Sequence, residues 1–227
     1  MNGLRNGLCI VVFAKAPLPG EVKTRLIPVL GARAAAALAR RMLHETLAQA
    51  VAADCARVEL CASPAPGSAA WAGVEIAPAV GWTEQGEGDL GARMARAAQR
   101  VLAAGDAVVL IGTDCPALDA GVLRQAAAAL RSSDAVMVPS ADGGYALLGL
   151  RRFHPSLFEG IVWSTPSVAA VTRARLAALG WATQLLAQLH DIDEAADLCW
   201  LPAAWGDFSA RGTRPLGIDE DKEASEQ

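Results

Sequence analysis

The sequence predicts an α/β protein with a Rossmann-like, three-layer α/β/α sandwich and a mostly parallel sheet. Short apolar runs rich in β-branched residues alternate with longer alanine-rich stretches, which is the pattern of β-α-β crossover units. The chain of 227 residues is 53% hydrophobic, so it can bury a continuous core. We expect one domain over residues 1–206 and a polar C-terminal tail over residues 207–227.

The apolar runs and the helical periodicity predict the order of the elements. In the first long alanine-rich stretch, Leu38, Met42 and Leu47 fall near one face at helical spacing, as expected of a helix that covers a sheet. The Pro-, Ala- and Gly-rich segment Ser63–Gly73 is predicted to be a loop. The predicted strands are Leu8–Ala14, Arg57–Ala62, Ala107–Ile111, Ala135–Pro139 and Tyr145–Leu150. The predicted helices are Ala32–Ala53, Leu90–Ala103, Ala120–Leu130, Ser167–Leu179 and Glu194–Leu201.

Charge and cysteine usage argue against several classes of function. The formal net charge is -4, so the chain lacks the basic balance typical of nucleic-acid-binding proteins. The five cysteines form no CxxC pair and the histidines lie far apart, which argues against a zinc site or a disulfide framework. We expect a cytoplasmic protein without a membrane span, in which C-terminal tryptophans either pack internally or cover a homodimer surface.

The loop after the first predicted strand gathers three cations within eleven residues. Lys15, Lys23 and Arg25 suit the oxygens of a polyphosphate, Gly20 permits a sharp turn, and Thr24 adds a hydroxyl. In an open parallel sheet, ligands bind beyond the carboxyl ends of the strands, where this loop lies. The spacing matches neither a P-loop nor a GxGxxG fingerprint, and solvated charges on an exposed loop are the alternative interpretation.

Carboxylates follow two further predicted strands and begin the last motif. Asp114 ends one strand and suits Mg²⁺ or Mn²⁺ held against phosphate oxygens, although a turn aspartate is the alternative. Asp142 precedes two glycines, which equally suit a hairpin. Asp193 is a second candidate metal ligand and also suits a helix N-cap. Cys115 has no histidine nearby in sequence, which disfavours a nucleophilic thiol.

The ordered set of motifs resembles the GT-A class of nucleotide-diphospho-sugar transferases. Within that class it is similar to a bacterial group of glycosyltransferase-like proteins, and more distantly to 2-phospho-L-lactate guanylyltransferase. The resemblance extends from Val12 to about Leu198. Its matching pieces are FAKAPLPGEVKTRL, QGEGDLGARM, IGTDCPAL, ADGGYALLGL, WSTPSV and DIDEAADL.

The resemblance implies a sheet with one reversed strand and a nucleotide lying across its first half. By position, Lys23 and Arg25 would contact phosphates, and Asp114 and Asp193 would hold the metal. The segment with Gln85, Gly86 and Asp89 would recognise the base, although Asp89 also suits a helix start. Relatives commonly have threonine where this chain has Glu194, so the surroundings of the metal site differ. WSTPSV would lie on the acceptor side, or begin a helix with Pro166 at its first position.

These expectations lead to three functional hypotheses. The first is a metal-dependent glycosyltransferase that uses a nucleotide-diphospho-sugar and a small acceptor, with Asp142 as the base and Lys23 and Arg25 neutralising the leaving diphosphate. The second is a nucleotidylyltransferase that joins a nucleoside triphosphate to a phosphorylated small molecule. The third is a non-catalytic nucleotide-binding module that keeps the fold.

Overall fold

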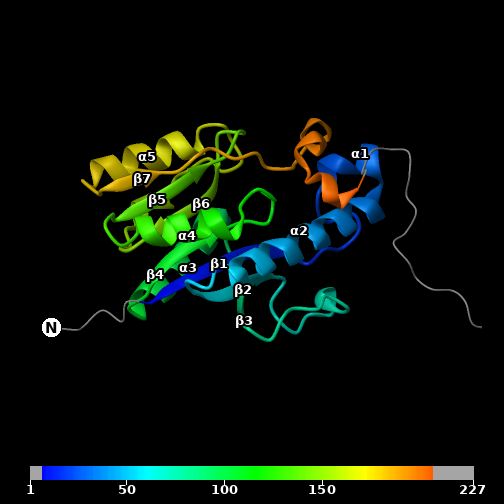
Figure 1. Cartoon of the computed structure of the whole chain (residues 1–227), viewed down its shortest axis with the longest axis horizontal. Coiled ribbons are helices and arrows are strands. Elements are labelled where there is room, and N and C mark those ends of the chain that lie inside the picture. Colours follow the sequence, from blue (N-terminus) through cyan, green and yellow to red (C-terminus); the bar gives the residue numbers. More distant parts are fainter. Residues whose placement is uncertain (1–6, 207–227) are drawn as a thin grey trace, which may run out of the picture.

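The computed structural model describes residues 7–206, which contain a single seven-stranded sheet (Figure 1). The strands lie in the order β3-β2-β1-β4-β6-β5-β7. β6 pairs antiparallel with β4 and β5, and the other pairs are parallel, so the sheet has one reversed strand as expected. The strands are β1 Leu8–Lys15, β2 Arg57–Ser63, β3 Val80–Glu84, β4 Ala107–Ile111, β5 Ala135–Pro139, β6 Tyr145–Leu150 and β7 Thr183–Leu185.

Helices cover both faces of the sheet and complete the predicted three layers. Alternate residues of β1 point to opposite faces: Ile10 and Val12 join a core with α2 and α4, whereas Cys9 and Val11 join a core with α3 and α5. The helices are α1 Ile27–Leu30, α2 Ala32–Ala52, α3 Leu90–Ala103, α4 Ala120–Ala129 and α5 Val168–Ala178. Helices cover both faces of the sheet, so a ligand can bind only beyond the carboxyl ends of the parallel strands.

A third, smaller core ties the C-terminal segment to the loop after β1. Leu26 from that loop, Met42 from α2, Ile192 and Trp205 are all buried together. In Figure 1 this C-terminal segment, drawn in orange, lies beside α1 and far from β7. The segment that carries Asp193 is therefore fixed against the segment that carries the predicted phosphate-binding cations.

The five predicted strands and four of the predicted helices are confirmed within a few residues. β3 and β7 were not predicted. The expected helix over Glu194–Leu201 is wrong in type, because Ala195–Trp200 is a 3-10 helix. The expected loop Ser63–Gly73 contains a short 3-10 turn at Ala69–Trp71. The predicted tail, residues 207–227, lies outside the described residues.

Between residues 7 and 206, no helix has the length and apolar character needed to cross a membrane.

Candidate functional site

A cavity of about 960 Å³ lies at the carboxyl-terminal edge of the parallel strands. The loop after β1, the loop after β4, the turn after β5 and the start of α3 all contribute to its walls. It contains most of the residues that the sequence singled out: Lys15, Lys23, Thr24, Arg25, Gln85, Asp89, Asp114, Asp142 and Asp193. Gly20 and Gly86 do not line it. Both have positive φ, 87° and 71°, so they shape the turns beside the cavity.

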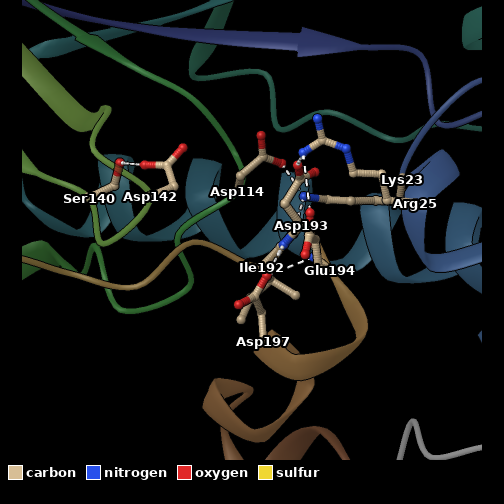
Figure 2. Close-up of polar contacts among 9 residues, drawn as sticks. All are labelled: Lys23, Arg25, Asp114, Ser140, Asp142, Ile192, Asp193, Glu194 and Asp197. Atoms are coloured by element: carbon tan, nitrogen blue, oxygen red, sulfur yellow. Dashed lines mark hydrogen bonds and ion pairs between the residues drawn. The ribbon is translucent and has the colours of Figure 1, made fainter. Parts of the chain in front are cut away.

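Lys23 ties three of the predicted motifs together. Its ammonium Nζ lies 2.6 Å from Oδ1 of Asp114 and also donates to the backbone carbonyl of Ile192 (Figure 2). The Ile192 N–H in turn donates to the Asp114 carbonyl at 2.7 Å. The Lys23 side chain is only 6% exposed, and its backbone is left-handed at φ 47°. This lysine is thus a buried connection between the loops, not a cation free in solvent.

Arg25 and Asp193 form a second ion pair across the same motifs. One Arg25 guanidinium nitrogen lies 2.5 Å from Oδ2 of Asp193, and both side chains are well exposed. Asp193 is not an N-cap, contrary to one expectation. The N-cap is Glu194, and the backbone N–H groups of Asp193 and Glu194 both donate to the Asp197 carboxylate, at 3.0 and 2.7 Å. The carboxylate of Asp193 therefore faces Arg25 and the cavity.

Asp142 lies in a tight turn that presents its carboxylate to the cavity. Oδ1 accepts a hydrogen bond from the Gly144 N–H at 2.8 Å. It also accepts one from the hydroxyl of Ser140 (Figure 2). Gly143, with φ 89°, packs so closely on Pro166 that a Cβ there would lie 2.2 Å from the proline carbonyl oxygen. The turn between β5 and β6 is consequently locked against the loop that precedes α5.

Asp191 is a cavity residue to which the sequence analysis assigned no role. Burial raises the pKa of its carboxyl, and the negative charges of Asp142, Asp197 and Asp114 raise it further. Asp191 reaches Asp142 because Leu189 bridges in parallel to Ser140 after β5. The sequence could have suggested Asp191 as a cavity residue, because it stands two residues before Asp193. The proximity of Asp191 to Asp142, however, depends on the pairing of Leu189 with Ser140.

The segment after β3 has a clear structural function. The Gln85 amide is buried and donates to the carbonyls of Ala14 and Cys61, at 3.1 and 3.0 Å, so it joins the ends of β1 and β2. Its oxygen accepts from Arg93 at 3.3 Å. Asp89 caps α3 by accepting the Ala92 N–H at 2.8 Å, which is the structural alternative expected for it.

The loop before α5 forms the far wall of the cavity. α5 begins at Val168 with Ser167 as N-cap, so Pro166 is not the first helical residue and that expectation is wrong. Trp163 lines the cavity, and its buried indole Nε1 has no hydrogen-bond partner among the described residues. The indole covers Gly91 in α3, where a Cβ would come within 2.7 Å of Nε1.

Cys115 does not have the surroundings of a nucleophile. Burial raises the pKa of its thiol to about 11, and Sγ donates to the His190 carbonyl at 3.1 Å. The sequence-based argument against a catalytic thiol therefore agrees with the geometry.

Carboxylate oxygens at the cavity are of the kind that bind a divalent cation. Within residues 7–206, no group of three or more His, Cys, Asp or Glu side chains is arranged to hold a metal alone. Mg²⁺ usually takes one or two protein carboxylates together with substrate phosphates. Asp114 is 57% exposed beside Lys23, so it can offer a carboxylate oxygen to such an ion.

The sequence matches the model of a family described as uncharacterized proteins conserved in bacteria, DUF2064, over residues 46–165. A crystal structure described as a "putative nucleotide-diphospho-sugar transferase", from Desulfovibrio desulfuricans G20, is 33% identical, with 85% of each chain covered and a TM-score of 0.77. The chain belongs to DUF2064. Its match spans more than half of this chain, and the D. desulfuricans protein extends the similarity over nearly all of the described fold.

More distant structures share the fold of this DUF2064 member. CMP:2-keto-3-deoxy-manno-octonic acid synthetase complexed with CTP is 13% identical, covering 88% of this chain and 98% of its own, with a TM-score of 0.55. The 4-diphosphocytidyl-2C-methyl-D-erythritol synthase of Anaerococcus prevotii is 9% identical, with the same coverage and TM-score. No curated protein matches the sequence. This Rossmann-like fold is thus shared with both of these proteins.

Proposed function

We propose that this protein transfers a glycosyl group from a nucleotide-diphospho-sugar to a hydroxyl of a small acceptor. The observation that supports it best is one cavity that joins Lys15, Arg25 and Asp114 on one side to Asp142 on the other. A diphosphate needs the cations, and an attacking hydroxyl needs a base a short distance away. The description of the D. desulfuricans relative agrees with this proposal.

The proposed step needs no residue outside the cavity. The acceptor oxygen forms a bond to the anomeric carbon, and the bond from that carbon to the diphosphate oxygen breaks with its electron pair on the oxygen. The acceptor proton passes to the free oxygen of Asp142, whose other oxygen is held by Gly144 and Ser140. This direct displacement inverts the anomeric centre. Lys15 and Arg25 hold the diphosphate while negative charge accumulates on it.

Mg²⁺ or Mn²⁺, when bound with the nucleotide, would supply further positive charge to the diphosphate. Asp114 would hold it, and Asp193 would join as a second ligand if its pair with Arg25 opens. Arg25 would then be free to bind a phosphate, because its side chain is 59% exposed and lines the cavity.

Nucleotidylyl transfer is the second candidate, and the cations favour it. Besides Lys23, which is held by Asp114, three basic side chains line the cavity (Lys15, Arg25 and Arg93), which suits the larger charge of a triphosphate. In that reaction a phosphorylated acceptor attacks the α-phosphate and pyrophosphate leaves.

Product analysis separates the candidates. The protein is incubated with Mg²⁺ or Mn²⁺ and either nucleotide sugars or nucleoside triphosphates, each with a mixture of hydroxyl-bearing and phosphorylated acceptors. Release of a nucleoside diphosphate supports glycosyl transfer, and release of pyrophosphate refutes it. Saturable binding with no turnover would indicate the non-catalytic module.

A further inference from the structure

We infer that the acceptor is an uncharged, polyhydroxylated molecule, such as a sugar or polyol, and not a phosphorylated or carboxylated one. The inference rests on the proposed function, because it names the second substrate of the same cavity. Three features support it: where the cations lie, what forms the opposite wall, and how Asp142 is held.

The cations occupy one half of the cavity. The donor half is formed by the loop after β1 and the end of β3, and it holds Lys15, Lys23 and Arg25. Arg93, the fourth basic lining residue among those the structure describes, lies on α3 and turns its guanidinium toward this half. Three of the four are anchored there: Lys23 by Asp114, Arg25 by Asp193, and Arg93 by Gln85 and by the Gly88 carbonyl at 2.8 Å.

The opposite wall, here called the acceptor half, is lined by Asp142, Gly144, Tyr145, Trp163, Thr165 and Pro166. No lysine or arginine within residues 7–206 lines this half. β4 lies between β1 and β6, so two strand spacings, about 10 Å, separate Lys15 from the start of β6. In Figure 2, Asp142 lies on one side of Asp114, and Lys23 and Arg25 lie on the other.

The acceptor half therefore repels anions and has the groups that bind hydroxylated rings. Asp191 adds a second carboxylate near Asp142. A phosphate placed here would meet two carboxylates with no cation to offset them. A sugar instead offers hydroxyl donors to the carboxylates and C–H faces to Trp163 and Tyr145.

The turn fixes how Asp142 meets such an acceptor. Because Oδ1 accepts from Gly144 and Ser140, and the backbone of Gly143 is packed against Pro166, the carboxylate is held toward the cavity. The oxygen left over, Oδ2, has no hydrogen bond to any described residue and is available to an acceptor hydroxyl.

The test measures acceptor binding directly, without turnover. Saturation-transfer-difference NMR on the full chain, with Mg²⁺ and a nucleoside diphosphate present, compares matched probes: glycerol with glycerol 3-phosphate, and glucose with glucose 6-phosphate. We expect each neutral probe to bind at least about tenfold more tightly than its phosphorylated partner, because of like-charge repulsion. Asp142→Asn should reduce the difference in affinity between the neutral and the phosphorylated probe. Asp142→Lys should make the phosphorylated probe the tighter binder.

Glu159→Gln is the matched control. Glu159 is exposed, carries the same charge as Asp142 and does not line the cavity. Removing the charge of Glu159 should therefore leave the relative affinities of the probes unchanged. Tighter binding of the phosphorylated probes to the wild-type protein overturns the inference. So does an unchanged preference in Asp142→Lys, or the absence of binding by every neutral probe.

The same samples separate failure of this inference from failure of the proposed function. A thermal shift with UDP, GDP, CDP and ADP reports on the donor half alone. If a nucleotide binds but phosphorylated probes are preferred, the inference fails and nucleotidylyl transfer gains. If no nucleotide binds while neutral probes are preferred, the proposed function fails and the acceptor inference survives.

Discussion

The ammonium of Lys23 lies 2.6 Å from the carboxylate of Asp114, although these residues are far apart in sequence. From the sequence, Lys23 is expected to bind phosphate and Asp114 to bind a metal ion. The side chain of Lys23 is buried, whereas that of Asp114 is 57% exposed. Lys23 is therefore held by the protein, and Asp114 keeps an oxygen facing the cavity. The cations of the loop therefore have different roles. Lys23 organises the site, Lys15 is available to a ligand, and Arg25 becomes fully available when its ion pair with Asp193 opens.

Replacing Lys23 by methionine should destabilise the fold, because it removes the donor that joins Asp114 to the Ile192 carbonyl. Partners left without a charged donor typically cost about 1–3 kcal/mol, and the exposure of Asp114 favours the lower end. The free energy of unfolding in urea measures this. Lys15→Met is the control, because Lys15 is exposed and has no ion pair among the described residues. This substitution should change the free energy of unfolding by less than about 0.5 kcal/mol. An equal loss of unfolding free energy in the two variants would contradict the structural role of Lys23.

Asp114→Asn should abolish the metal-dependent part of nucleotide binding, because a neutral amide is a poor ligand for Mg²⁺. It should also lower stability, because the buried Lys23 ammonium loses its carboxylate partner. The measurement is the thermal shift by a nucleoside diphosphate with and without Mg²⁺. Asp54→Asn removes the same charge at an exposed position away from the cavity and should behave as wild type. A metal-dependent shift that persists in Asp114→Asn would remove this residue from the metal site.

Trp205→Ala should destabilise the protein by about 3–5 kcal/mol, the usual cost of truncating a buried aromatic side chain. Trp205 is 9% exposed, stacks under the Arg41 guanidinium at 4.7 Å from the ring centroid, and packs in the core that contains Leu26 and Ile192. Nucleotide affinity should fall as well, because that core positions the Lys23 loop. Trp200→Ala, at a side chain 56% exposed, should cost far less. Urea denaturation of both variants checks the contrast.

Alkylation should distinguish the five thiols. Burial raises the pKa of Cys9 and of Cys115 to about 11, so at pH 8 only about one molecule in a thousand carries the reactive thiolate at either position. Cys199 is exposed and should react with iodoacetamide first, as read by peptide mass spectrometry. Cys115→Ala should retain activity. Early labelling of Cys115 would instead reveal an accessible, activated thiol.

Asp191→Asn should stabilise the protein at pH 7. Folding raises the pKa of Asp191 above its ordinary value of 3.8, so its ionised form opposes folding. The wild-type protein is relieved of this penalty as pH falls through the raised pKa, and the relief is complete below 3.8. The variant should thus show a higher urea midpoint at pH 7 and none of that advantage at pH 3. An advantage that is constant with pH would have a different cause.

Much of the fold follows from local sequence. The bounds of β4, β5, β6 and α3 are as predicted, since each is an apolar run or an amphipathic stretch. Local signals mark some of these bounds, such as Pro139 at the end of β5 and the N-cap Asp89 at the start of α3. The placement of Lys15, Asp114 and Asp142 at one sheet edge was likewise predictable. Residues that directly follow parallel strands must meet at the edge where those strands end.

Pairing and packing decided the rest. β3 and β7 have weak apolar patterns and form because the edges of β2 and β5 offer unpaired backbone groups, which no local run of letters records. The sequence by itself determined the layers, the edge and the types of charge that gather there. Only the tertiary structure decided that Lys23 is buried on Asp114, that Gln85 binds strand carbonyls, and that Asp191 lines the same cavity as Asp142, because each depends on contacts between residues distant along the chain.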